Sequence, residues 1–216
     1  TADNHTLFAR WTINQYTITF DSAGGSEVDP ITQDYGTAIT PPADPTRDGY
    51  NFVVWDPELP ETMPAEDITL VAQWQVIEYT ITYHFDGGTN DAANPASYTI
   101  ETATITLNPA TKTGYTFAGW YDAATGGNKV ESIPQGSTGN KALYARWVAN
   151  QYTVTFDAQD GTVEPATKQV TYDSAYGDLP VPVKTGYSFD GWFTEAEGGD
   201  LVAAETVVQT ADNHTL

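Results

Sequence analysis

Short runs along the chain alternate apolar with polar residues, and turns rich in glycine or proline separate them. In the segment 16–20, Tyr16, Ile18 and Phe20 alternate with two threonines. Related runs at 79–83 and 152–156 begin with the same Tyr-Thr pair. A period of two is typical of a half-buried β-strand, and no segment has the 3.6-residue apolar stripe of an amphipathic helix. The pattern therefore predicts a mainly β protein, or a β-rich α+β protein at most.

A longer motif occurs three times, at residues 46–55, 112–120 and 184–192. Each copy contains a Gly-Tyr pair, a Phe two residues after the Tyr, and a Trp three residues after the Phe. A short alternating run that ends in Trp follows the first two copies, at 70–74 and 143–147. Several motifs that recur in a fixed order indicate a tandem array of small modules.

The repeats predict where each module begins and ends. Residues 1–11 align with a closing run, because Leu7, Ala9 and Trp11 match its alternating positions. The segments that join the modules contain no Gly, Pro or Ser, which is not a flexible-linker composition, so we expect an extended rod. The predicted parts are a closing strand of a preceding repeat at 1–11 and modules at 12–75, 76–148 and 149–216, the last with a truncated closing strand.

The heptapeptide TADNHTL occurs at residues 1–7 and again at 210–216, a spacing of 209 residues (210 minus 1). We therefore expect 209-residue blocks that repeat head to tail. A sheet without its closing strand exposes unpaired backbone groups that favour the addition of a strand. The links are either covalent, in one long chain, which we favour, or formed by strand donation between separate chains. The predicted inter-copy strand, which lies in the third module of another copy, comprises Leu7, Phe8, Ala9, Arg10 and Trp11.

The aromatic residues and glycines shared by the repeats are the predicted core. Modules of this size are near the lower limit for folding on one core, and cysteine is absent, so aromatic burial has to compensate. The alternative is an exposed aromatic platform for sugars, for which Tyr121, Tyr144 and Phe193 are better placed. The predicted repeat core comprises Tyr16, Phe20, Gly49, Tyr50, Phe52, Trp55, Trp74, Tyr79, Gly114, Tyr115, Phe117, Trp120, Trp147, Tyr152, Phe156, Gly186, Tyr187, Phe189 and Trp192.

The formal charge is −21, with only 8 Lys and Arg residues, which argues against nucleic acid or an anionic membrane as a partner. No apolar run approaches the roughly 18 residues of a membrane helix, so we expect no membrane insertion in this segment.

No catalytic, metal or cofactor site is predicted. His84 has no Ser or Cys partner in its strand, and the carboxylates are scattered as on a solvated surface. The segment 157–161 is only a partial match to a calcium-binding loop. Asn4 and Asn213 each begin an N-glycosylation sequon, a triplet that often arises by chance.

Three segments carry a family resemblance: YTITYHFDGGTN at 79–90, NPATKTGYTFAGWY at 108–121 and GSTGNKALYARW at 136–147. They resemble the Listeria–Bacteroides repeat family, which includes the internalin B-type B repeats. The resemblance implies small β-grasp-like (ubiquitin-like) modules, in tandem on bacterial or archaeal surface proteins, without catalytic residues. The first module departs from the pattern, with Val54-Trp55-Asp56 in place of Gly-Trp-aromatic.

The leading hypothesis is therefore a non-enzymatic structural or adhesive segment of a secreted cell-surface rod or extracellular filament. Its partners would be copies of itself, head to tail. The alternative is a ligand-binding adhesin whose modules recognise a glycan or a host or partner protein, and an enzyme ranks third. A ligand site should appear as a polar-aromatic cluster peculiar to one module, and the sequence contains none.

Overall fold

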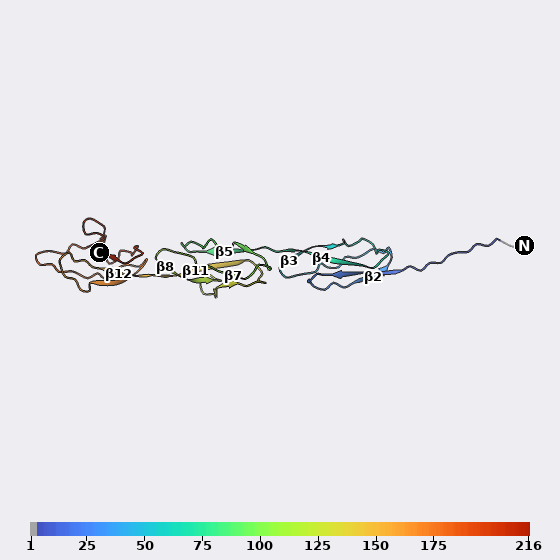
Figure 1. Ribbon diagram of the computed structural model, residues 1–216, viewed down its shortest axis with the longest axis horizontal. Coiled ribbons are helices and arrows are strands. Elements are labelled where there is room, and N and C mark those ends of the chain that lie inside the picture. Colours follow the sequence, from blue (N-terminus) through green and yellow to red (C-terminus); the bar gives the residue numbers. More distant parts are fainter. Residues whose placement is uncertain (1–3) are drawn as a thin grey trace. The chain divides into compact units, whose positions relative to one another are not determined.

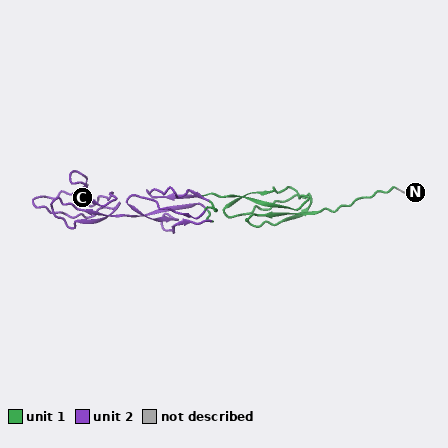
Figure 2. Cartoon of the chain, viewed as in Figure 1, with its two compact units in different colours: residues 1–79, 99–102, 136–138 green, residues 80–98, 103–135, 139–216 purple. Residues whose placement is uncertain are grey.

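The computed structural model describes residues 4–216, and these residues form strands and turns without a helix (Figure 1). The mainly β prediction is confirmed. None of the described residues forms a helix that could cross a membrane. The chain divides into two compact units (Figure 2). Unit 1 contains the residues up to 79 with the turns 99–102 and 136–138, and unit 2 contains 80–98, 103–135 and 139–216.

Unit 1 contains a four-stranded sheet with the order β2-β1-β4-β3. The two central strands run parallel, whereas each outer strand is antiparallel to its neighbour. The strands are β1 (Gln15–Asp21), β2 (Ile31–Asp34), β3 (Tyr50–Asp56) and β4 (Ile68–Val76). Alternation along β1 and β4 directs one side chain in two towards the core. The buried cluster is Ile18, Phe20, Trp55, Met63, Leu70 and Ala72.

The first sheet of unit 2 belongs to the second repeat and has the order β6-β5-β11-β8-β9. Its strand β11 is parallel to β5 and antiparallel to β8. In the same way, β4 of the first repeat is parallel to β1 and antiparallel to β3. The strands are β5 (Tyr79–His84), β6 (Ser97–Tyr98), β8 (Tyr115–Tyr121), β9 (Lys129–Val130) and β11 (Lys141–Ala149), with a separate pair β7 (Ile105–Thr106) and β10 (Ser132–Ile133).

The third repeat, also in unit 2, forms two smaller sheets. The first has the order β13-β12-β16 and the second pairs β14 with β15. The strands are β12 (Gln151–Thr155), β13 (Thr167–Thr171), β14 (Trp192–Phe193), β15 (Leu201–Val202) and β16 (His214–Thr215). In the second repeat, β11 lies between β5 and β8 and pairs with both. In the third repeat, β16 is only two residues long, and no described strand joins β12 to β14 in this way.

A β-bulge explains the spacing of the Phe and Trp in the repeated motif. Residues three apart on a regular strand point to opposite faces of a sheet. The pairing of β3 with β4 skips one residue between Phe52 and Val54, which returns Phe52 and Trp55 to the same face. Their ring centroids lie 5.3 Å apart. The spacing is 5.4 Å both between Phe117 and Trp120 and between the third repeat's Phe189 and Trp192.

Burial divides the predicted core residues into three groups. The tryptophan of each motif is buried, as are Phe20, Phe156, Gly49 and Gly114. The half-buried residues are Tyr16, Tyr50, Tyr79, Tyr115, Tyr152, Phe52, Phe117 and the closing tryptophans Trp74 and Trp147. In the third repeat the expectation is wrong for Gly186, Tyr187 and Phe189, which are exposed. No described strand covers these three residues, in contrast to their counterparts under β4 and β11.

Candidate functional site: the module junction and the open edge of the third repeat

The closing tryptophan completes the first two repeats. The indole N–H of Trp74 donates to the carbonyl of Ser22 at 3.0 Å, and that of Trp147 donates to the carbonyl of Phe85 at 2.9 Å. The glycine that follows each opening strand leaves room for the ring. A Cβ at Gly25 or Gly88 would stand 2.5 Å from the tryptophan. The Gly turn and the closing Trp, distant in sequence, therefore form one packing unit.

A cation lies over the motif tyrosine in all three repeats. Arg47 lies 3.9 Å from the centre of the Tyr50 ring, and Lys112 lies 4.3 Å from that of Tyr115. In the third repeat, Lys184 lies 4.8 Å from the centre of the Tyr187 ring. Such contacts contribute about 0.5–1 kcal/mol at exposed sites. Three of the chain's 8 basic residues thus occupy one repeat position, where each holds an aromatic ring.

The Gly-Tyr turn of the first repeat contacts the turn 99–102, and both belong to unit 1. A Cβ at Gly49 would stand 2.7 Å from that of Ile100, so the backbone fits closely against this side chain. The Tyr50 hydroxyl donates to the Glu101 carboxylate at 2.6 Å. This hydrogen bond raises the pKa of Tyr50 above its ordinary value.

The same junction occurs inside unit 2, between the second and third repeats. A Cβ at Gly114 would collide with the Tyr172 ring, and the Tyr115 hydroxyl donates to the Asp173 carboxylate at 2.9 Å. The hydrogen bond raises the pKa of Tyr115. The pKa of Asp173 is lowered by this bond and by a second one from the Gln209 amide, at 3.0 Å. Each junction thus combines a glycine seated against a side chain with a phenol–carboxylate hydrogen bond.

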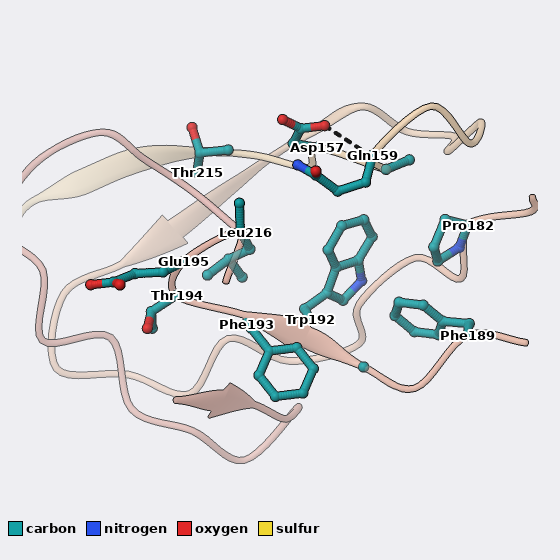
Figure 3. A pocket seen from close by; sticks show the side chains of 13 residues that line it. Asp157, Gln159, Pro182, Phe189, Trp192, Phe193, Thr194, Glu195, Thr215 and Leu216 are labelled. Carbon is teal, nitrogen blue, oxygen red and sulfur yellow. Dashed lines mark hydrogen bonds between the residues drawn. The ribbon is translucent and has the colours of Figure 1, made fainter. Parts of the chain in front are cut away.

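The third repeat presents the equivalent surface without a neighbour. Apart from its two chain neighbours, no described residue places an atom within 4 Å of a Cβ built on Gly186, and Tyr187 is 73% exposed. Two adjoining cavities, of about 280 and 430 Å³, share Phe189 and Pro182 in their walls. Figure 3 shows the smaller one, with Trp192 between Leu216 and Phe189. We name the path along both cavities, from Leu216 to Tyr187, the open edge.

Leu216 marks the register at one end of the open edge. Its N–H donates to the carbonyl of Thr155 at 2.9 Å, and its carbonyl accepts the N–H of Asp157 at 2.8 Å. These bonds continue the parallel pairing of β12 with β16. Leu216 is buried, like Leu70 beside Phe20 and Leu143 beside Tyr83. Leu216 therefore occupies the position that opens the closing strand in the first two repeats.

The predicted inter-copy strand lies exposed in this chain. Phe8 is 86% exposed and Trp11 is 92% exposed, and the described residues 4–14 pair with no strand. The segment therefore completes no sheet within its own chain, and its place in another copy stays a prediction.

The remaining candidate residues have packing roles. His84 stacks on Tyr144 with ring centroids 4.4 Å apart, and Tyr121 lies under the Arg146 guanidinium at 3.8 Å. Phe193 is exposed and lies in the wall of the open edge. Within the described part of the chain, no three His, Asp or Glu side chains gather in a way that would hold a metal ion. In the partial calcium-loop match, Asp157 accepts the N–H of Gln159 at 2.9 Å.

Comparison with known families gives three matches in tandem. The model of the Listeria-Bacteroides repeat domain matches residues 16–73, 79–146 and 152–216. The chain belongs to the Listeria-Bacteroides repeat family. The predicted resemblance is thereby confirmed.

The curated relatives that this chain matches are much longer than the chain. A protein of Evansella cellulosilytica, provisionally named a membrane protein, is 34% identical over an alignment of 209 positions. The alignment covers 91% of this chain and 31% of the relative. Internalin H of Listeria monocytogenes is 37% identical over 139 residues, which are 64% of this chain and 24% of the relative. This chain thus spans about a third or less of these curated relatives.

Among solved structures, the match is to domains 3–4 of the Streptococcal High Identity Repeats in Tandem, from a cell surface protein. The identity is 20%, and the match covers 63% of this chain and 98% of that one. The TM-score of 0.28 carries no argument about the fold.

The residues that receive the Gly-Tyr turn at each junction were not predicted from the sequence. Ile100 with Glu101, and Tyr172 with Asp173, follow the second strand of their repeats and receive the preceding Gly-Tyr turn. The usable signal is a large apolar residue followed by an acid at one repeat position. It is weak, because the first repeat has Tyr35 followed by Gly36 there.

Proposed function

We propose that this chain is a non-enzymatic structural segment of a cell-surface protein, in which Listeria-Bacteroides repeats form an extended spacer that supports adhesion. The observation that carries the proposal is the repeated junction. Both Tyr50 and Tyr115 use their hydroxyl groups to bind a carboxylate of the following turn, and the glycine before each is seated against a side chain. Within unit 2, the contacts of Gly114 and Tyr115 would restrict bending between the second and third repeats.

The chemistry that the repeats of this chain share supports a structural role. Cations, aromatic rings and glycines shared by the repeats contact one another, and His84 and His214 are engaged in packing with Tyr144 and Tyr176. We assign no catalytic step and no cofactor to this segment. A net charge of −21 would keep neighbouring spacers apart and soluble.

An extracellular location and head-to-tail copies are part of the proposal. Support for the location comes from the family and from the Evansella relative with its membrane-protein name. Support for head-to-tail repetition comes from the identical residues 1–7 and 210–216. Recognition of a glycan or protein ligand by the modules is the alternative, and it would appear as binding that survives disruption of the junctions.

We also propose that each module is a reduced β-grasp fold. The order β2-β1-β4-β3, with a parallel central pair, supports this relation. The third repeat has the same opening pair, β13 beside β12.

Small-angle X-ray scattering of the dilute chain tests the spacer. A compact globule of this length has a radius of gyration of about 17 Å, and an extended arrangement should clearly exceed this value. Gly114→Ala should reduce the radius or broaden the distance distribution, because the new methyl group collides with Tyr172.

Gly186→Ala is the matched control. Its φ of +83° resembles the +78° of Gly114, so the backbone strain is alike, but the described residues beyond its chain neighbours place no atom within 4 Å of its Cβ. The scattering of this variant should equal that of the wild type. A wild-type radius close to the compact value, or equal responses of the two variants, would contradict the proposed spacer.

A further inference from the structure

The outward face of the sheet in the second repeat carries a row of polar side chains from four strands. Tyr144 of β11 pairs with His84 of β5 on one side and with Tyr121 of β8 on the other. Tyr121 pairs in turn with Lys129 of β9. Residues directly opposite each other point to the same face of a sheet, and Leu143, next to Tyr144, is buried on the other face. We name His84, Tyr144, Tyr121 and Lys129 the polar row.

Stacking holds the rings of the polar row upright. The centroids of the His84 and Tyr144 rings lie 4.4 Å apart, with only 9° between the ring planes. The Arg146 guanidinium lies 3.8 Å from the centre of the Tyr121 ring and donates to carbonyls of the turn that follows this tyrosine. Side chains of a strand stand roughly perpendicular to the sheet. The polar tips of the rings, rather than their faces, are therefore presented to solvent.

The tips of the polar row are hydrogen-bond donors with little else to bind. Within the described part of the chain, neither the tyrosine hydroxyls nor the imidazole of the row have a hydrogen-bond partner. The Lys129 side chain crosses the sheet over Gly119, where a Cβ would stand 2.5 Å from the Cε of the lysine. Its ammonium group reaches Glu131 at 3.8 Å, and the Glu131 side chain is 82% exposed, so this ion pair is weak. The row thus offers two phenols, an imidazole and an ammonium group to an acceptor.

The polar row is peculiar to the second repeat. The first repeat has carboxylates on both sides of a valine at the matching positions: Asp21, Val71 and Asp56. The third repeat has an acid and two apolar residues in place of the histidine, the β8 tyrosine and the lysine: Asp157, Phe193 and Leu201. The shared fold therefore does not require the row. A polar-aromatic cluster confined to one module is the pattern expected of a ligand site, and it was not apparent in the sequence because its members come from four separate segments.

The second repeat is also far less acidic than its neighbours. Residues 76–148 contain 6 Asp and Glu against 4 Lys and Arg, which gives a net charge of −2. Residues 12–75 contain 11 acids against one Arg, and residues 149–216 contain 11 acids against two Lys, which gives −10 and −9. An anionic ligand is therefore repelled least by the second repeat, where Lys129 and Arg146 lie on the same face of the sheet.

We propose that the polar row binds an acidic polysaccharide, whose hydroxyls and carboxylates accept hydrogen bonds from the tips of the row. The carboxylates of such a polymer complement the charges of Lys129 and Arg146. A peptide strand has no edge to extend here, because β5, β11 and β8 each pair with a neighbour on both sides. The dense charge of a nucleic acid would be opposed by the chain's net charge of −21. This binding site would add to the proposed spacer, and its existence does not depend on the junctions.

NMR titration of the full chain tests the site with oligomers of galacturonate, hyaluronate and sialate, and with a neutral oligomer of galactose. At least one of the carboxylated oligomers should shift the amide signals of the polar row. The galactose oligomer should bind at least about tenfold more weakly, because it lacks the charge that Lys129 attracts. The matching positions of the first repeat are an internal control, since their signals should not move: Asp21, Val71 and Asp56.

Variants of the polar row should weaken binding while the sheet stays intact. Tyr144→Phe removes one hydroxyl and keeps the stack on His84, so the affinity should fall about fivefold. Tyr121→Phe should have a similar effect, and phenylalanine occupies this position in the third repeat. Lys129→Leu introduces the residue that the third repeat has, and it should lower the affinity about tenfold and reduce its dependence on salt.

Lys168→Leu is the charge-matched control for Lys129→Leu. Lys168 lies on β13 of the third repeat and donates to the carbonyl of Asp178 at 2.6 Å. Its removal changes the net charge equally but leaves the polar row intact, so this variant should bind like the wild type. Tyr187→Phe, which removes an exposed hydroxyl of the third repeat, is the control for the tyrosine variants and should also bind like the wild type.

Four results would overturn the proposed site. In the first two, none of the carboxylated oligomers shifts the polar row, or the galactose oligomer binds as tightly as they do. In the third, Lys129→Leu and Lys168→Leu lower the affinity equally, which would indicate nonspecific charge attraction. In the fourth, an oligoglutamate peptide or a single-stranded DNA binds more tightly than every acidic oligosaccharide. None of these results bears on the radius of gyration, so the spacer and the binding site can fail separately.

Discussion

The second and third repeats share their motifs but differ at one edge. In the second repeat, β11 connects β5 to β8, and Tyr115 and Phe117 are half-buried. In the third repeat no described strand lies between β12 and β14, and Tyr187 and Phe189 are 73% and 41% exposed. Trp192 nevertheless remains buried at 4% exposure, close to the 1% of Trp120.

The comparison separates two layers within a repeat. The inner layer is anchored by the buried leucine and the first tryptophan, and it is present in all three repeats. The outer layer comprises the Gly-Tyr turn, the motif phenylalanine and the cation, and it requires the closing tryptophan for cover. Stability should therefore reside mainly in the inner layer, while the outer layer provides contacts between repeats.

Replacement of the first tryptophan should have the largest effect. Trp120→Ala should lower the free energy of unfolding of the second repeat by about 3–5 kcal/mol. Trp192→Ala should cost about 1 kcal/mol less, because Trp192 contacts two aromatic rings, whereas Trp120 contacts Tyr83, Phe85 and Phe117. Urea unfolding followed by residue-resolved NMR measures both. A larger loss for Trp192→Ala would reverse the comparison.

Removal of the closing tryptophan should make the second repeat resemble the third. Trp147→Ala uncovers Phe117 and leaves Lys112 without its second ring, so we expect a loss of about 2 kcal/mol in the second repeat. Trp11→Ala in dilute solution is the control, because Trp11 is 92% exposed, and its effect should be near zero. Thermal unfolding of the two variants gives the difference. Equal midpoints would show that the outer layer adds no stability.

The phenol–carboxylate bond should have the smallest effect, visible at the extremes of pH. The pKa of Tyr115 is raised, so the contribution of Tyr115 to the free energy of unfolding is complete below pH 10. This contribution is lost as the pH rises through the folded-state pKa of Tyr115. The lowered pKa of Asp173 means that its contribution is complete above pH 3.8 and is lost as the pH falls. Tyr115→Phe should reduce the pH dependence of the melting temperature on both sides.

Tyr187→Phe serves as the control for this pH series. Among the described residues the Tyr187 hydroxyl meets no carboxylate, so its removal should leave the pH dependence of melting unchanged. A Tyr115→Phe profile that coincides with the wild type would mean that the bond to Asp173 contributes nothing to stability.

The sequence predicted the strands and the inner layer because both follow from short-range alternation. Ile18, Phe20 and Leu70 lie where the period of two places them. The bulge between Phe52 and Val54 was not predictable, because it depends on pairing with β4. In the sequence, the bulge appears as the recurrent spacing of three residues between Phe and Trp. This spacing indicates a bulge only when the two side chains are known to lie on the same face of the sheet.

The open edge and the junctions were less predictable for a different reason. Tyr187 and Phe189 have the same sequence context as Tyr115 and Phe117, and only the missing cover changes their exposure. Likewise, Glu101 and Asp173 contact tyrosines 51 and 58 residues away. Local patterns carry no information on such distant partners.

Amide hydrogen exchange on the dilute, monomeric chain tests most directly the claim that the closing strand completes each repeat. Residues 116–119, paired with β11, should exchange at least about tenfold more slowly than residues 188–191, which face the open edge. Equal protection of the two segments would contradict the account, because the closing strand would then add nothing to the motif beside it.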